Sequence, residues 1–263
     1  MIFLDKNQDN NLLVNWSFLS KDIFEEAHFQ NEVFLSENLL SNDLSKTIFE
    51  EINKESLDVL NTRVSSNENK SHTKNFGPLT SQLISVFNSN QFIRFVEKTF
   101  CLKKNSLKSD SYFSGGGIHF SKKNQFLKMH QDFNYHPITY MKRVINIIIY
   151  LNDDWIQEYG GILSLTRTKS EINEIVKVIP KQRQIMFRTD TNIWHGVNEI
   201  LADKNRVSIA LYYYEKLSFF SILMSLFTGR MTRFHSHKGI KNLIPYFQHK
   251  LMILKNIFFQ KNN

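Results

Sequence analysis

The feature that most constrains this chain is a His-x-Asp pair followed, far downstream, by a second histidine. His130 and Asp132 are separated by one residue, and His195 follows about sixty positions later. Side chains alternate between the two faces of a strand, so His130 and Asp132 on a strand would point the same way. A third ligand must then come from a strand that is adjacent in space but distant in sequence. The pattern therefore predicts a sheet fold with long-range strand pairing.

Two imidazoles and one carboxylate are the minimal ligand set of a mononuclear non-haem Fe(II) centre, in which one face of the metal stays open. Arg206 lies eleven positions after His195, at the start of the apolar run 207–214. A guanidinium there can form a bidentate pair with a carboxylate that reaches from the metal. A lone His-x-Asp arises often by chance, whereas two ligands, a gap, a third ligand and an arginine in this order are a specific signal.

Several further segments carry a resemblance to a known family. They are the glycine-rich 114–119, the lead-in 126–130, the Asp-Phe-Asn-Tyr-His-Pro run 132–137, residues 143–152, Trp155 with 159–161, and 206–214. Over roughly residues 75–215 the chain resembles the 2-oxoglutarate- and Fe(II)-dependent oxygenases of the prolyl 4-hydroxylase-like branch. More narrowly, it resembles a bacterial and phage-type subgroup with the signature HxDFNxHP.

The resemblance implies a reaction and its cofactors. His130, Asp132 and His195 would bind Fe(II), and 2-oxoglutarate would be the co-substrate together with O₂. Its oxidative decarboxylation to succinate and CO₂ would be coupled to hydroxylation of a substrate, with ascorbate as a candidate reductant. The substrate is not specified by the sequence and ranges from a peptidyl proline to an amino acid, a glycan or another small molecule.

The co-substrate site is also implied by the resemblance. Arg206, helped by Tyr150 and Asn146, would bind the far carboxylate of 2-oxoglutarate. Alternation along 143–150 puts Asn146, Ile148 and Tyr150 on the face opposite Ile145, Ile147 and Ile149. A buried core tyrosine with a bonded hydroxyl is the other interpretation of Tyr150.

Other interpretations of these residues stay open. His130 and Asp132 can form an ordinary hydrogen bond on a strand, and Asp203 can neutralise Arg206 in a salt bridge. His119 and His136 are left out of the metal set, because most histidines near a metal site act behind the ligands. A catalytically silent cupin-like binding module, or a Zn(II) or Mn(II) hydrolase, could carry the same three ligands. The hydrolase would give Arg206 no obvious role.

Composition is that of a single oxygenase-sized domain with appendages. The 263 residues are 41% hydrophobic and include 23 Phe, which suffices for a sizeable core. The single Cys101 excludes an intramolecular disulfide and suits a reducing compartment. No secretory signal and no apolar run of membrane-spanning length is visible, so we expect a cytoplasmic protein.

Three regions are expected along the chain: a support region of strands and helix over 1–74, the oxygenase domain over 75–215, and a tail over 216–263. In the first region we expect strands at 12–18 and 32–35, then a helix from Ser41 or Ser45 with Asn42 or Ser45 as N-cap, then a loop at 65–72. Residues 79–100 are expected to form one long amphipathic helix or a helix pair. These helices would buttress one face of the sheet.

Short strands dominate the second region. We expect them at 144–151, 162–165, 175–179, 184–187 and 207–214, separated by turn-rich breaks. The resulting fold class is α+β, with a double-stranded β-helix (a cupin-like jelly roll), buttressing N-terminal helices and a helical basic extension at the C-terminus.

The tail holds all of the net charge. Residues 216–263 contain eight Lys or Arg and no Asp or Glu, so the remaining 25 basic residues balance all 25 acidic ones. An apolar stripe at helical spacing runs from Ile240 to Phe258. A helix packed on the jelly roll, or a peripheral anchor on an anionic membrane at the inner face, would both fit. Nucleic-acid binding is not expected, and a homodimer is left open by the sequence.

Overall fold

The structure is a computed structural model that describes residues 3–16, 32–36, 39–54, 60–63, 69–73, 76–113, 115–132, 136, 139, 141–168, 174–181 and 183–216. The expectation of a helical, basic tail at 217–263 lies outside the described residues.

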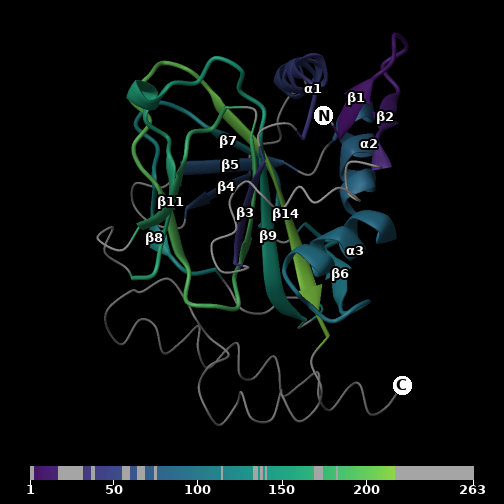
Figure 1. Cartoon of the computed structure of the whole chain (residues 1–263). Coiled ribbons are helices and arrows are strands. Elements are labelled where there is room, and N and C mark those ends of the chain that lie inside the picture. The colour runs from purple at the N-terminus through teal and green to yellow at the C-terminus, as the bar shows by residue number, and fades with distance from the viewer. Residues whose placement is uncertain are drawn as a thin grey trace.

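Two antiparallel sheets form the centre of the protein (Figure 1). The small sheet has the order β11 (Glu174–Val178), β10 (Leu163–Thr166), β13 (Trp194–Val197) and β8 (Leu127–His130). The large sheet has the order β3 (Val33–Ser36), β12 (Gln184–Arg188), β9 (Lys142–Tyr150), β14 (Arg206–Glu215), β7 (Gly117–Ser121), β5 (Asn69–Thr73) and β4 (Leu60–Arg63), and β6 (Leu107–Ser109) also pairs with β14. The expected jelly roll is confirmed.

The N-terminal region contributes strands to this large sheet. β3 pairs with β12, and β5 pairs with both β4 and β7. The expected loop at 65–72 is therefore wrong for residues 69–72, which lie in β5. Long-range pairing with β7 supplies the hydrogen bonds of this polar segment, and local sequence gives no signal of such pairing. Near the N-terminus, β1 (Leu4–Lys6) pairs with β2 (Leu12–Val14), which is shorter than the strand expected at 12–18.

Three helices lie beside the large sheet, on the side away from β8 and β11 (Figure 1). They are α1 (Asn42–Lys54), α2 (Pro78–Phe87) and α3 (Asn90–Thr99). The helix-pair interpretation of 79–100 is correct, because α2 ends at Phe87 and Ser89 caps the next helix by accepting a hydrogen bond from the Phe92 N–H at 3.2 Å. No helix among the described residues has the length and apolar character needed to cross a membrane.

The main core lies between these helices and the large sheet. Apolar side chains of α1, α2 and α3 pack there against alternate residues of β9 and β14. On β9 these are Ile145, Ile147 and Ile149, joined by Val144 near the start of the strand, whereas Tyr150 belongs to a second core between the two sheets. The alternation expected for β9 is confirmed, and it turns Asn146, Ile148 and Tyr150 away from the helices.

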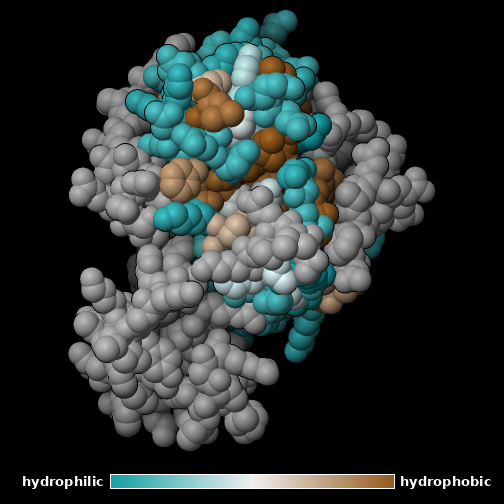
Figure 2. All heavy atoms as spheres, turned by 90° about the vertical axis from the view of Figure 1, so that its left-hand side faces the viewer, coloured by the Kyte–Doolittle hydropathy of each residue, from teal (hydrophilic) through white to brown (hydrophobic). Residues whose placement is uncertain are grey.

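The small sheet is only partly covered. The edge strands β11 and β8 each have one buried residue among exposed and half-buried ones, whereas all four residues of β10 and nine of the ten residues of β14 are buried. Seen from the side of β8 and β11, the protein presents hydrophilic residues interrupted by hydrophobic patches (Figure 2). An antiparallel sheet with one packed and one solvated face has this property.

Side chains from neighbouring elements cap the helices. α1 begins after Ser41, whose hydroxyl accepts a hydrogen bond from the Leu44 N–H at 3.1 Å. The N-cap is therefore Ser41, and neither Asn42 nor Ser45 has this role, since both lie inside the helix. The first turn of α2 is capped from α1: the Glu51 carboxylate accepts hydrogen bonds from the backbone N–H groups of Leu79 and Thr80, each at 2.9 Å.

This cross-helix cap generates a stability prediction. Glu51→Ala leaves two N–H groups at the start of α2 without their carboxylate, so we expect the free energy of unfolding to fall by about 1–2 kcal/mol. Urea unfolding followed by circular dichroism measures the change. The control is Glu50→Ala at the neighbouring exposed position, which should change stability by less than about 0.5 kcal/mol. Equal effects of the two substitutions would contradict the capping role.

Candidate metal centre

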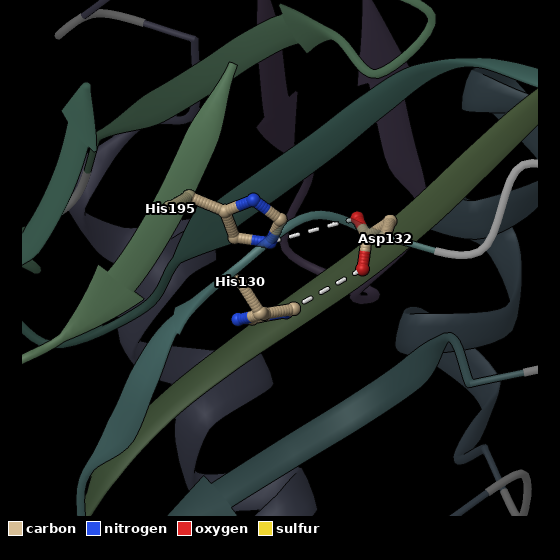
Figure 3. A group of neighbouring side chains, drawn as sticks. All are labelled: His130, Asp132 and His195. Carbon is tan, nitrogen blue, oxygen red and sulfur yellow. Dashed lines mark ion pairs between the residues drawn. The ribbon is translucent and has the colours of Figure 1, made fainter. Parts of the chain in front are cut away.

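Three side chains converge between the two sheets (Figure 3). His130 ends β8, and His195 on β13 lies opposite it in the strand register. Asp132 Oδ1 lies 3.6 Å from His130 Nε2, and Asp132 Oδ2 lies 3.5 Å from His195 Nε2. One donor atom from each residue lies within 4.8 Å of the other two, and among the described residues this is the one such group of three or more His, Cys, Asp or Glu. The three donors can therefore surround one ion.

The local geometry differs from the expectation of one continuous strand. β8 ends at His130, so Asp132 lies beyond the end of the strand. A register shift between β8 and β13 pairs Leu127 with Val197 and His130 with His195, so β8 has one residue more than its partner. Such a bulge changes the alternation of side chains. It places both Leu127 and His130 toward the space between the sheets.

Hydrogen bonding selects the tautomer of the first histidine. His130 Nδ1 lies 2.8 Å from the carbonyl oxygen of Lys128. A carbonyl accepts only, so Nδ1 carries a proton and Nε2 is the ring nitrogen directed toward Asp132. A backbone carbonyl behind a metal-binding imidazole commonly has this orienting role.

The Asp132 carboxylate is held by two further groups. Asn146 Nδ2 donates a hydrogen bond to Oδ2, and Arg143 Nη1 lies 3.4 Å from the same oxygen. Burial alone would raise the pKa of Asp132, but the charges of His195 and Arg143, with the hydrogen bond to His130, hold this pKa well below its usual value. The carboxylate is thus ionised and oriented, as a metal ligand requires.

Arg143 was not identified from the sequence as a site residue. Simple alternation along β9 would place it with Ile145 on the helix side. A register shift in the pairing of β9 with β14 instead sets Tyr214 opposite Arg143 and Tyr213 opposite Ile145. The bulge turns the Arg143 guanidinium inward, where it lies 3.9 Å from the ring centroid of Tyr212. Spacing alone carries no signal of this bulge.

Asn146 lies where the sequence placed it, but against another group. It was expected to help bind 2-oxoglutarate, and the described structure shows its amide donating to Asp132. Asn146 Oδ1 is buried and has no hydrogen-bond partner among the described residues. Asn146 therefore supports the carboxylate of the metal site, and its amide still borders the pocket.

Arg206 occupies a separate part of the same space. Its side chain is 6% exposed. The Nε–H donates to the carbonyl of Gly161 at 2.8 Å, and Nη2 donates to the Tyr150 hydroxyl at 3.2 Å. Burial lowers the pKa of Arg206, and no carboxylate of the described residues contributes to it. Asp203, the alternative partner considered from the sequence, is exposed. A buried guanidinium without an acidic partner is suited to an anionic ligand.

One pocket connects the three potential metal ligands with Arg206. The other two histidines near the motif are held apart from the cluster: His119 lines the pocket and contacts the Gly115 carbonyl at 3.0 Å, and His136 pairs with Asp110 at 3.0 Å. The pocket is lined by His119, Ser121, Gln125, Phe126, Leu127, His130, Asp132, Asn146, Ile148, Leu163, His195, Val197, Ile200, Arg206, Ser208, Ala210 and Tyr212.

This geometry agrees with the comparison to protein families. Residues 116–214, which contain His130, Asp132, His195 and Arg206, match the family model of the 2OG-Fe(II) oxygenase superfamily. Residues 116–214 form a 2OG-Fe(II) oxygenase domain. The protein is accordingly a non-haem Fe(II)- and 2-oxoglutarate-dependent oxidoreductase, and the donor set of two imidazoles and a carboxylate fits that metal. No curated protein sequence matches the chain significantly.

Solved structures share the fold at low sequence identity. A prolyl hydroxylase from Trichoplax adhaerens, in complex with a peptide fragment of the hypoxia inducible factor oxygen degradation domain, is 17% identical with a TM-score of 0.51, over 79% of this chain and 91% of that one. A 2OG-Fe(II) oxygenase family oxidoreductase from Burkholderia pseudomallei is 12% identical with a TM-score of 0.51, over 80% and 95%. The carbocyclase SnoK of nogalamycin biosynthesis is 11% identical with a TM-score of 0.50, over 80% and 91%.

The triad generates a prediction about metal binding. Asp132→Ala or His195→Ala removes one of three protein donors, so we expect loss of tight Fe(II) retention and of 2-oxoglutarate turnover while the fold is kept. Anaerobic dialysis followed by iron analysis measures retention, and circular dichroism checks the fold. His119→Gln, in the same pocket but outside the triad, should retain the metal. Full retention and turnover in either alanine variant would contradict the assignment.

Proposed function

We propose that His130, Asp132 and His195 bind a single Fe(II), and that Arg206 with Tyr150 binds the far carboxylate of 2-oxoglutarate. When bound, the metal and 2-oxoglutarate supply the oxidising chemistry: decarboxylation to succinate and CO₂ coupled to hydroxylation of a substrate by O₂. The observation that carries the proposal is the shared pocket, which contains the cluster of two histidines and one carboxylate together with a buried arginine that has no acidic partner among the described residues. A silent binding module would require neither the free metal face nor this arginine, and a hydrolase would not require the arginine.

The protein's own residues orient and shield these groups. The Lys128 carbonyl fixes the His130 ring, and Asn146 with Arg143 fixes Asp132. Burial raises the pKa of Tyr150, so its hydroxyl keeps its proton and can donate a hydrogen bond to a carboxylate beside Arg206. The apolar wall of the pocket, which includes Ile148, limits access of water.

Further parts of the proposed function are the bounds of the catalytic unit, the reductant, the location and the substrate class. We propose that residues 75–215 contain all catalytic groups, with 1–74 as support, that ascorbate acts as the reductant, and that the protein works in the cytoplasm. The Trichoplax adhaerens neighbour was solved with a peptide fragment bound, so a peptidyl substrate is the first class to test. Succinate release over a panel of peptides, amino acids, glycans and small metabolites identifies the class.

The arginine generates a prediction about co-substrate affinity. Arg206→Ala should raise the KM for 2-oxoglutarate on the order of 10²-fold, since a charge-assisted bidentate pair in a desolvated pocket is worth roughly 2–4 kcal/mol. Arg206→Lys should recover only part of this loss, because an ammonium lacks the planar fork. Steady-state succinate formation gives KM.

Lys204 provides a matched control for this prediction. It lies two positions from Arg206 in sequence and pairs with Asp154 at the surface. Lys204→Ala removes a cation from the same segment and should leave the KM for 2-oxoglutarate at the parent value. If Arg206→Ala also leaves it there, the carboxylate binds elsewhere, and Lys142, Arg143 and Arg167 become the candidates.

We propose that the basic tail 216–263 makes peripheral contact with an anionic membrane surface. Its support is the composition: eight basic residues, no acidic ones and an apolar stripe from Ile240 to Phe258. Full-length protein should co-sediment with anionic vesicles at low salt and less so at high salt, while protein truncated after Lys216 stays folded and active but in the supernatant. Truncated protein that loses solubility or dimerises differently would instead assign the stripe to the jelly roll or to a second copy.

A further inference from the structure

The segment that holds Arg206 is itself held by one buried indole. Arg206 donates its Nε–H to the carbonyl of Gly161 at 2.8 Å. The carbonyl of the preceding residue, Gly160, accepts a hydrogen bond from Trp155 Nε1, also at 2.8 Å. Trp155 is 1% exposed, so this N–H depends on the Gly160 carbonyl rather than on water. Two adjacent carbonyls thus connect the indole to the guanidinium.

The backbone between them has a conformation that only glycine adopts easily. Gly160 has φ of 68° and Gly161 has φ of 67°. A Cβ on Gly160 would lie 2.0 Å from the Glu199 carbonyl oxygen. A Cβ on Gly161 would lie 3.1 Å from Arg206 Cδ and 3.2 Å from Trp155 Cζ2. The Gly161 backbone is therefore packed between the arginine side chain and the indole ring, and a side chain at position 161 would press against both.

Neighbouring residues brace the rest of this segment. The short helix η3 (Gln157–Tyr159) precedes the glycines, and the Leu201 N–H donates to the Tyr159 carbonyl at 2.9 Å. The Gly161 N–H donates to the Glu199 carbonyl at 3.2 Å. The Ile162 N–H, which shares a peptide plane with the Gly161 carbonyl, donates to Asn198 Oδ1 at 2.6 Å. The Trp155 N–H is the side-chain donor to the Gly160 carbonyl, in the preceding peptide plane. Loss of the indole N–H would remove the side-chain bond to the Gly160 carbonyl, and the Gly161 carbonyl next to it would then be positioned by Asn198 without Trp155.

We propose that Trp155 is a positioning residue for 2-oxoglutarate: together with Asn198 it orients the Gly161 carbonyl that fixes the Arg206 guanidinium. The inference rests on the proposed function of Arg206. Gly161 and Tyr150 engage the Nε–H and one Nη2–H, so a fixed part of the guanidinium fork faces the co-substrate carboxylate. A tilt of the fork weakens a bidentate contact more than it weakens simple charge attraction. Trp155 therefore acts on the distal carboxylate only and not on the metal.

The experiment compares two 2-oxo acids in the full chain. Anaerobic Fe(II)-loaded protein is titrated with 2-oxoglutarate and with 2-oxopentanoate, which has the same keto-acid end and no distal carboxylate. The visible absorption of the metal chelate reports binding without turnover. In Trp155→Phe, the Kd for 2-oxoglutarate should rise about tenfold, the Kd for 2-oxopentanoate should stay within about twofold, and iron retention should not change.

Tyr213→Phe is the matched control. Tyr213 lies on the same strand as Arg206 but faces the helices, and its buried hydroxyl donates to the Phe87 carbonyl at 2.8 Å. Tyr213→Phe removes a buried hydrogen bond to a backbone carbonyl, as Trp155→Phe does, so its stability should fall similarly. Its Kd values for 2-oxoglutarate and 2-oxopentanoate should both stay at the parent level. If Trp155→Phe folds poorly, benzothienylalanine at position 155 keeps the ring shape and removes only the N–H donor.

The outcomes separate this inference from the proposed function. A parent protein that binds both acids equally would refute the role of Arg206 itself. A parent that prefers 2-oxoglutarate, with the same preference in both the Phe and the benzothienylalanine variants, would overturn the role of Trp155 alone. Equal weakening of both acids would also overturn it, because that is the effect of general loosening. Selective loss of 2-oxoglutarate affinity supports it.

Discussion

Antiparallel pairing of β8 with β13 sets His195 directly across from His130, and the rest of the site depends on that contact. The two strands are separated by more than sixty residues of chain that includes β9, β10, β11 and β12. Their pairing therefore requires the whole roll to close. Asp132 can join the histidines because β8 stops at His130 and the chain turns away from the strand line. The metal site is thus a property of the closed fold and not of a local segment.

The second constraint on the interior is the presence of buried charged side chains. Asp132, Arg143 and Arg206 are all largely removed from water, which is costly unless each charge finds a partner. Burial acts to lower the pKa of Arg143, but the negative charge of Asp132 raises it above its usual value. Arg206 has a tyrosine and a backbone carbonyl instead. One site thus contains two cations with different roles. Arg143 supports the metal ligand Asp132, and Arg206 is left for a second anion.

The sequence predicted the features that follow from simple periodicity. Ile145, Ile147 and Ile149 face the helices while Tyr150 faces inward, because β9 alternates regularly over those residues. The order of ligands and arginine also predicted the family. Arg143 was missed because a bulge reverses the alternation at the start of the same strand, and β5 was missed because its polar residues form a strand only through pairing with β7. Both errors arise where tertiary pairing overrides local pattern. Trp155 belonged to the resembling segments, yet its contact with Gly160 could not be deduced from spacing.

The two sheets that form the pocket differ in what covers their outer faces. Arg206, Tyr150 and Asn146 project from β14 and β9, whose opposite faces are covered by the helical layer. His130 and His195 project from β8 and β13, in a sheet whose edge strands β8 and β11 carry exposed residues. Arg206 therefore projects from a sheet that is backed by the helices, and the histidines project from a sheet with exposed edge strands. Exposed positions on β8 and β11, such as Lys128 and Lys177, have little packing to lose. The outer edges of the small sheet can therefore vary in sequence while the histidines on its inner face and Arg206 on the other sheet are retained.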